Sequence, residues 1–370
     1  MLSIPVSPIR EGRRARSEAA ERGIWLRWGV ATKRPTIALL GAPGVPPPTN
    51  LDEIADLATI RNCTADTLPD ALPGSDILLV WDFFSRALKD NWGPATADLR
   101  WVHVCAAGVD SLLFDDLRSA DVVVTNAAGV FDRPIAEFVL ASILARDKQL
   151  HLSKALQSER VWRHRETVRT EGSSALVIGT GGIGRATARL LSAVGLRVTG
   201  AGRTSRESDA DFGTVLPTSD LASFVGDFDN VVAIAPLTPQ TDRMIDATVL
   251  RAMRDDAHLI NVGRGQLVDE PAMIEALSAG EIGAASLDVF TDEPLDPSSP
   301  LWAMDNVAIS AHMSGDVVGW RDELARLFLA NLRRYLGSDG RSPSEVLENI
   351  VDKERGYVVS TGHGGGDSRL

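Results

Sequence analysis

The chain has few cysteines, no excess of positive charge and no long hydrophobic run. Only two of its 370 residues are cysteines, which argues against a disulfide framework and indicates a reducing compartment such as the cytoplasm. No apolar run approaches the roughly 18 residues that span a bilayer, so no membrane segment is expected. The net charge of −12 argues against a general nucleic-acid binder. The composition, 44% hydrophobic and 24% charged, is typical of a folded globular protein.

Both ends of the chain differ from its middle. Residues 1–34 carry eight basic and three acidic side chains, a net charge of +5, and show neither a strand pattern nor a secretory signal. We predict a disordered extension or an over-long gene start there. An organelle-targeting segment is the alternative, although the acidic residues fit it poorly. Residues 359–370 are Gly-rich and are predicted to form a disordered tail.

Between the ends, short β-rich runs alternate with helical stretches, which is the pattern of parallel α/β sheets. The length of the chain favours two domains. We predict a substrate domain formed by residues 35–132 together with 315–358, and a doubly wound dinucleotide-binding domain formed by residues 133–314. The predicted strands lie at 35–40, 76–81, 99–104 and 121–125 in the first domain, and at 175–178, 196–201, 230–234, 258–261, 284–288 and 307–310 in the second.

A long helix is predicted to start at Pro134. Proline suits the first turn of a helix, because the N–H group that it lacks would have no partner there. Residues 135–145 are apolar on nearly every side, so this helix should be buried between domains or subunits. We therefore predict a homodimer built on it.

A glycine-rich loop, GTGGIG, begins at Gly179 directly after a predicted strand and opens a predicted helix. Gly179 allows a tight turn, Gly181 lets the backbone approach a pyrophosphate, and Gly184 lets the helix pack closely on the strand. The N-terminus of the helix then faces the anion. The motif in this place predicts a dinucleotide site, and the alternative is a glycine-rich turn without a ligand.

The residues after the next strand bear on which nicotinamide dinucleotide is bound. An acidic residue that would bind the ribose 2′-hydroxyl is expected at this strand end, but Gly202 stands there and Arg203, Thr204 and Arg206 follow. Arginine can hold a 2′-phosphate through charge-assisted hydrogen bonds, whereas a carboxylate would repel it. We predict a preference for NADP(H), with NAD(H) as the alternative cofactor. If Arg203 and Arg206 merely face solvent, they do not indicate which cofactor is bound.

Three polar residues each follow a predicted strand of the second domain: Arg264, Glu293 and His312. The carboxyl edge of an open α/β sheet is where ligands bind. Arginine can hold a carboxylate through two bonds, histidine can exchange a proton near neutral pH, and a neighbouring glutamate orients the imidazole and favours its charged form. Each residue alone could be structural, but together they indicate a catalytic set. No metal site is predicted.

The ordered set of motifs resembles the D-isomer-specific 2-hydroxyacid dehydrogenases over roughly residues 35–358. The motifs are AAGVDSL from 106, VTNAAGVFDRPIAEFVL from 124, GTGGIG, NVGRGQLVDE, LDVFTDEPL with SPLW, and the segment around His312. The resemblance implies an NAD(P)-dependent oxidoreductase in which a Rossmann domain is inserted in a smaller, flavodoxin-like catalytic domain. It also implies dimers formed through the Rossmann domain.

The resemblance assigns roles to individual residues. It places catalysis on Arg264, Glu293 and His312, and the amides that bind the substrate carboxylate on Ala107–Val109, with Gly108 at the centre. A small D-2-hydroxy acid or its 2-oxo form, such as glyoxylate or hydroxypyruvate, would be the substrate. Asp288 matches the residue that orients the nicotinamide carboxamide. The full set of expected cofactor contacts is Gly179, Gly181, Gly182, Ile183, Gly184, Arg203, Thr204, Arg206, Pro236, Val262, Gly263, Asp288 and His312.

Departures and rival functions remain open at this point. Ala311 stands where the family usually has proline, which bears on local loop geometry. Glu293 argues against the formate dehydrogenase branch, and the residues after Gly202 resemble the glyoxylate and hydroxypyruvate reductases. One rival is a nucleotide-sensing protein like the C-terminal binding protein corepressors. The other is a catalytically silent homologue, against which the complete catalytic set argues. Four aromatic residues could line the pocket or belong to the core: Trp81, Phe83, Phe84 and Phe131.

Overall fold

The computed structural model describes residues 34–359. All but one residue of the predicted extension, and all but one of the predicted tail, lie outside this range. The described chain divides into two compact units. Unit 1 contains residues 34–105, 114–125 and 324–351, and unit 2 contains residues 106–113, 126–323 and 352–359. Within the described range, no helix is long and apolar enough to cross a membrane.

Unit 1 is built on a five-stranded parallel sheet of order β2-β1-β3-β4-β5, which is the flavodoxin order. The strands β1, β3 and β4 are buried along their whole length, as their continuous apolar sequences require. Strand β2 was not predicted, because most of its side chains are polar and exposed at the edge of the sheet. The strands are β1 Thr36–Leu40, β2 Thr59–Cys63, β3 Ile77–Val80, β4 Trp101–Val104 and β5 Val123–Thr125.

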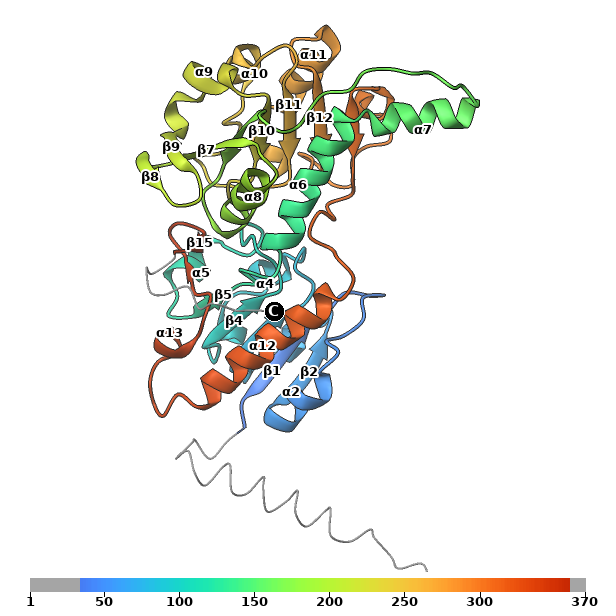
Figure 1. Ribbon diagram of the computed structural model, residues 1–370. Coiled ribbons are helices and arrows are strands. Elements are labelled where there is room, and N and C mark those ends of the chain that lie inside the picture. Colours follow the sequence, from blue (N-terminus) through green and yellow to red (C-terminus); the bar gives the residue numbers. More distant parts are fainter. Residues whose placement is uncertain (1–33, 360–370) are drawn as a thin grey trace, which may run out of the picture. The chain divides into compact units, whose positions relative to one another are not determined.

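Helices cover this sheet (Figure 1). The longest is α12, whose later part packs on β4: the ring of Trp101 stacks on Phe328 at 5.2 Å and on Tyr335 at 5.6 Å between centroids. The helices of this part of the chain are α2 Leu51–Leu57, α3 Leu68–Ala71, α4 Ala87–Asp90, α5 Asp115–Ser119, α12 Trp320–Leu336 and α13 Pro343–Val346, with a 3₁₀ turn at Pro94–Thr96.

Unit 2 contains an eight-stranded sheet of order β13-β12-β11-β10-β6-β7-β9-β8, parallel except for β8. Strand order reverses between β6 and β10, and such a reversal forms a crevice at the carboxyl edge of the sheet. The predicted doubly wound fold is confirmed, but six strands were expected here. The two additional strands are β8, which is polar and largely exposed, and β9, which pairs with it. The strands are β6 Ser174–Ile178, β7 Arg197–Gly202, β8 Arg206–Asp209, β9 Gly213–Pro217, β10 Asn230–Ala233, β11 His258–Asn261, β12 Ala284–Leu287 and β13 Val307–Ile309.

A small two-stranded hairpin, β14 Val351–Asp352 and β15 Tyr357–Val358, follows later in the chain. Its turn residues and β15 belong to unit 2. The helices of unit 2 lie on both sides of its large sheet (Figure 1). They are α6 Asp132–Asp147, α7 Leu150–Glu159, α8 Gly182–Ala193, α9 Leu221–Phe224, α10 Ala247–Ala252 and α11 Glu270–Ala279, with 3₁₀ turns at Thr218–Asp220, Val225–Asp227, Gly265–Leu267 and Pro300–Ala303.

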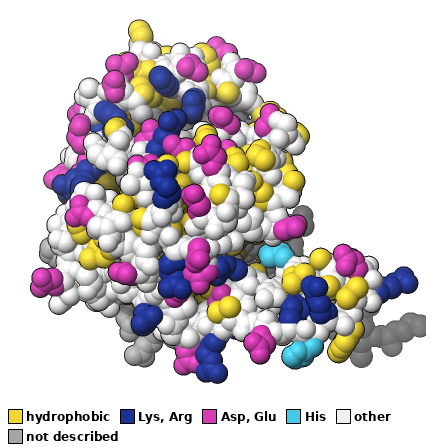
Figure 2. Space-filling view, turned by 90° about the horizontal axis from the view of Figure 1, so that it is seen from above, with side chains coloured by type: hydrophobic (Ala, Val, Ile, Leu, Met, Phe, Trp, Pro, Cys, Tyr) yellow, Lys and Arg dark blue, Asp and Glu magenta, His cyan; other side chains and the backbone are white. Residues whose placement is uncertain are grey.

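Helix α6 packs against α8 and begins at Asp132, two residues before Pro134. Its buried apolar face includes Val139 and Ile143, whereas Leu144 is 36% exposed. Helix α7 and the segment after it project from the unit and carry further exposed apolar side chains (Figures 1 and 2), among them the fully exposed Trp162. Several apolar side chains of α6, α7 and the following segment are therefore left uncovered in the single chain.

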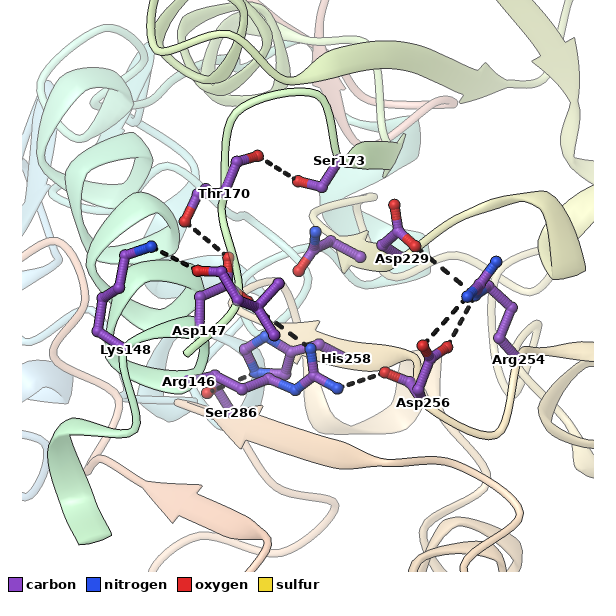
Figure 3. Close-up of polar contacts among 12 residues, drawn as sticks. Arg146, Asp147, Lys148, Thr170, Ser173, Asp229, Arg254, Asp256, His258 and Ser286 are labelled. Carbon is purple, nitrogen blue, oxygen red and sulfur yellow. Dashed lines mark hydrogen bonds and ion pairs between the residues drawn. The ribbon is translucent and has the colours of Figure 1, made fainter. Parts of the chain in front are cut away.

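A polar network lies at the amino ends of the strands, at the edge of the sheet opposite the crevice (Figure 3). The carboxylate of Asp229 accepts hydrogen bonds from the Ser174 amide at 2.7 Å and hydroxyl at 2.8 Å, and Thr170 donates to Asp147 at 2.7 Å. A cavity of about 550 Å³ beside the network is lined by acidic and basic side chains, several of them paired with each other. The network ties the end of α6 and the following segment to the sheet.

Candidate active site

The glycine loop has the geometry that a pyrophosphate requires. Gly179 has φ +122°, and a Cβ there would lie 2.8 Å from the amide nitrogen of Ala235. A Cβ on Gly184 would lie 1.9 Å from the carbonyl oxygen of Gly179, so no side chain fits at either position. At Gly181, by contrast, nothing lies within 4 Å of such an atom, which leaves open space at the N-terminus of α8. The loop therefore fits the pyrophosphate of a dinucleotide.

The arginines after β7 have different partners. Arg203 donates from Nη2 to the Tyr357 hydroxyl at 2.8 Å, whereas Arg206 donates from Nε to the Asp209 carboxylate at 3.0 Å. Both arginines were expected to face a 2′-phosphate. Arg206 is thus held by a carboxylate that it shares with Arg185, whereas the partner of Arg203 is neutral. Thr204, between them, is exposed.

The predicted carboxylate-binding loop, Ala107–Val109, lies against Arg264. A Cβ on Gly108 would lie only 1.9 Å from Nη2 of that arginine, so the peptide and the guanidinium are in close contact. Asn126 holds the loop by donating to the Ala107 carbonyl at 2.6 Å. Among the described residues, the three loop amides donate to no acceptor. They are therefore able to bind a substrate carboxylate.

Arg264 is held by Asp110, a residue that the sequence analysis missed. Nε and Nη2 both approach Asp110 Oδ1 at 3.0 Å, and Nη1 donates to the Gly263 carbonyl at 2.7 Å. The hydrogen bonds engage Nε and one N–H of Nη1, and Nη2 takes part in the ion pair, which leaves N–H groups on Nη1 and Nη2 for a ligand. The position of Asp110, an acid two residues after Gly108 in the same loop, was a signal that could have identified it.

His312 and Glu293 form a hydrogen-bonded pair, with Nδ1 2.7 Å from Oε2. Burial alone would raise the pKa of Glu293, but its hydrogen bonds with His312 and with the amide of Phe290, the latter at 3.0 Å, lower it. Glu293 is therefore a carboxylate at neutral pH. Because Nδ1 is engaged by Glu293, proton exchange with a substrate has to take place at Nε2.

The loop that carries His312 is strained and is tied down by Asp288. His312 has φ +50°, in the left-handed region that non-glycine residues seldom adopt. Its amide donates to the Asp288 carbonyl at 2.7 Å, and the amides of Met313 and Ser314 donate to the carboxylate of Asp288. Ser310 donates to the same carboxylate at 2.5 Å. The fully buried Asp288 thus positions the histidine loop, and its expected contact with the nicotinamide stays a prediction.

The remaining predicted cofactor positions lie at the same edge of the unit 2 sheet. Pro236 is exposed after β10, and Val262 and Gly263 are buried between β11 and Arg264. Of the aromatic candidates, Trp81 and Phe131 are buried, Phe83 is half-buried, and Phe84 is 60% exposed. Within residues 34–359, no group of three or more His, Cys, Asp or Glu side chains could hold a metal ion.

Comparisons with known proteins show which family this chain resembles. Residues 140–314 match the family model described as D-isomer specific 2-hydroxyacid dehydrogenase, NAD binding domain. Over 270 residues the chain is 31% identical to the glyoxylate reductase of Thermofilum pendens, covering 70% of this chain and 78% of that protein. It is 29% identical to the glyoxylate/hydroxypyruvate reductase A of Arabidopsis thaliana, covering 75% of this chain and 84% of that protein.

A solved structure shows the same fold. The D-isomer specific 2-hydroxyacid dehydrogenase from Xanthobacter autotrophicus Py2, crystallised in complex with NADPH and MES, superimposes with a TM-score of 0.72. It is 30% identical to this chain, and the match covers 88% of this chain and all of that one. The chain therefore belongs to the D-isomer-specific 2-hydroxyacid dehydrogenase family, and it is an NAD(P)-dependent oxidoreductase of 2-hydroxy acids.

Proposed function

We propose that the protein reduces a small 2-oxo acid, with glyoxylate and hydroxypyruvate as the first candidates, and that it uses NADPH. The observation that carries this proposal is the contact between Arg264, which has N–H groups left for a ligand, and the loop of unpaired amides around Gly108. The names of the glyoxylate and hydroxypyruvate reductases among its relatives support the same substrates. The comparisons give no support to the corepressor alternative.

The proposed mechanism follows from the positions of the polar groups. The substrate carboxylate binds the amides of Ala107–Val109 and Arg264, and a remaining N–H of Arg264 polarises the ketone oxygen. NADPH, held at the glycine loop after β6, would supply the hydride for the reduction. His312 donates a proton from Nε2 to the developing alkoxide, and ionised Glu293 stabilises the imidazolium before transfer.

The proposed catalytic side chains, Arg264, Glu293 and His312, all belong to unit 2. The carboxylate-binding loop was predicted in the substrate domain, residues 35–132 with 315–358, yet residues 106–113 cluster with unit 2. We propose that unit 2, with residues 133–314 as the dinucleotide-binding domain, supplies the cofactor site and every polar side chain named in the mechanism.

A turnover screen tests the proposed function directly. Purified protein is mixed with NADPH or NADH and with glyoxylate, hydroxypyruvate or the bulkier phenylpyruvate, and the loss of cofactor absorbance is followed. We expect the two small acids to be reduced and to have the highest kcat/KM. If no 2-oxo acid is reduced with either cofactor, the proposal is wrong.

Cofactor preference should depend on Arg203 and not on Arg206. We expect NADPH to be favoured over NADH in kcat/KM, and Arg203→Ala to lower the value for NADPH by roughly 10- to 100-fold, the scale of a charge-assisted hydrogen bond. Arg206→Ala is the matched control, because that arginine is held by the Asp209 carboxylate and not by the Tyr357 hydroxyl. Equal efficiency with both cofactors in the wild-type protein would contradict this assignment.

We also propose a homodimer formed through α6, extended by the exposed apolar side chains of α7. One face of α6 is buried within unit 2, but Leu144 on another face and Leu150 on α7 are exposed in the single chain. Sedimentation equilibrium at micromolar concentration should give about twice the chain mass of 39.7 kDa. Leu144→Asp should shift the protein toward monomers, because it places a charge in the interface. A wild-type monomer would overturn the proposal.

A further inference from the structure

The partner of Arg203 is contributed by a distant part of the chain. Tyr357 lies in strand β15, 154 residues further on, and its hydroxyl accepts a hydrogen bond of 2.8 Å from Nη2 of Arg203. The guanidinium carbon also lies 6.0 Å from the centre of the phenol ring, at the outer limit of a cation–π contact. Both residues belong to unit 2. The arginine is therefore bonded to a side chain that lies outside the strand–loop–strand region of the proposed cofactor site.

Arg203 has a neutral hydrogen-bond partner, whereas three other arginines of unit 2 are bonded to carboxylates. Nearby, Asp209 accepts hydrogen bonds from Arg185 and Arg206, and Asp211 accepts them from Arg185 and Arg189. The hydrogen bond from Arg185 lowers the pKa of Asp209, so this carboxylate is firmly ionised. These arginines are held by carboxylates. Arg203, in contrast, forms an ion pair with no described residue, and its bond to a phenol leaves its charge uncompensated.

Arg203 also stands at the position where a 2′-substituent would be recognised. It directly follows Gly202, the last residue of β7, which provides no carboxylate to bind a ribose hydroxyl. A Cβ on Gly202 would lie 3.2 Å from the hydroxyl of Thr180 in the glycine loop, so this strand end adjoins the loop proposed to hold the pyrophosphate. An uncompensated guanidinium beside that loop is suited to a phosphate dianion.

We propose that Tyr357 is a positioning residue for NADPH recognition. Its hydroxyl oxygen accepts a hydrogen bond from Arg203 and so holds the guanidinium near the end of β7. Strand β15 thereby becomes part of the cofactor site. This inference rests on the proposed preference for NADPH.

Direct binding measurements on the full chain test the role of Tyr357. Dissociation constants for NADPH and NADH are measured by energy transfer from the eight tryptophans to the bound cofactor, without substrate. Tyr357→Phe keeps the ring and removes the hydroxyl. It should weaken NADPH binding roughly five- to tenfold, the effect of one hydrogen bond, and leave NADH binding within about twofold of wild type. The chain has only one other tyrosine, so Tyr335→Phe is the matched control, and it should bind both cofactors like the wild type.

A variant that carries both Arg203→Ala and Tyr357→Phe shows whether Tyr357 acts through Arg203 or through a general effect on the structure. If Tyr357 acts through Arg203, Tyr357→Phe should add little to the effect of Arg203→Ala. Unchanged NADPH binding in Tyr357→Phe, or an equal loss for both cofactors, would overturn the role of Tyr357. If Arg203→Ala itself leaves NADPH binding unchanged, the phosphate assignment in the proposed function fails instead.

Discussion

Replacing Arg264 with lysine should lower kcat/KM for a small 2-oxo acid by about 30- to 1000-fold. This range corresponds to roughly 2–4 kcal/mol, the contribution of one well-placed donor to a developing oxyanion. Lysine retains the charge but cannot bind Asp110 through two nitrogens and also present N–H groups to the carboxylate and ketone oxygens. We expect both a higher KM and a lower kcat, because the arginine is proposed to act in substrate binding and in the transition state.

The chain contains a matched control for this substitution. Arg254 also contacts a carboxylate through two nitrogens, Nε at 2.8 Å and Nη2 at 3.1 Å from Asp256, but it lies at the amino ends of the strands (Figure 3). Arg254→Lys loses the same paired geometry away from the proposed chemistry, and its steady-state kinetics should match those of the wild type. Wild-type kinetics in Arg264→Lys would mean that this arginine does not bind the substrate.

Removing the imidazole of His312 should reduce the rate of 2-oxo acid reduction by about 10²- to 10⁴-fold, the usual range for a general acid. His312→Ala removes the proton donor that is proposed to act from Nε2. The loss should appear in kcat at saturating substrate, and direct titration should show that NADPH still binds. A variant that keeps most of its rate would require a different proton donor.

The charge of Glu293 should set the pH at which this rate declines. Its pKa is lowered, so Glu293 is ionised from mildly acidic pH upward and stabilises a protonated His312. A general acid must be protonated, so the reductive rate should fall as pH rises. In Glu293→Gln the charge that stabilises the imidazolium is absent, so the fall should begin at a lower pH than in the wild type.

The control for that profile is Asp296→Asn, which removes a fully exposed carboxylate three residues away that is bonded to Ser298 and not to His312. Its pH profile of kcat/KM should follow that of the wild type. If the profiles of Glu293→Gln and wild type also superimpose, Glu293 does not tune His312. The change in pH dependence belongs to the coupled pair.

The sequence was informative where one residue type is required by geometry. The spacing of Gly179, Gly181 and Gly184 predicted a tight loop between strand and helix, because close backbone contacts exclude side chains at the first and last of these positions. The sequence also predicted that Arg264, Glu293 and His312 follow strands of one sheet edge, because parallel strands bring their carboxyl ends together. The sequence analysis missed partners that depend on tertiary structure: Asp110 beside Arg264, and Asn126 beside Ala107.

Strands β2 and β8 were also not predicted, because they too depend on tertiary structure. Strands β2 and β8 have no apolar alternation, because each lies at the edge of its sheet and is supported by a neighbour on one side only. Hydrogen bonding to β1 and to β9, rather than burial of their own side chains, makes them strands. Their existence could be read only from the three-dimensional pairing.

The polar edge strands β2 and β8 also affect the tendency of the protein to aggregate at high concentration. An edge strand offers unpaired N–H and C=O groups that can recruit a strand from another molecule, which is a common first step in aggregation. Strand β2 has five residues and carries Arg61, and β8 has four residues, of which Arg206, Glu207 and Asp209 are charged. Adding a foreign strand to either edge would bring its side chains against these charges and gain little apolar contact. The polarity that conceals β2 and β8 in the sequence thus helps to keep crowded copies of the protein from polymerising through their sheets.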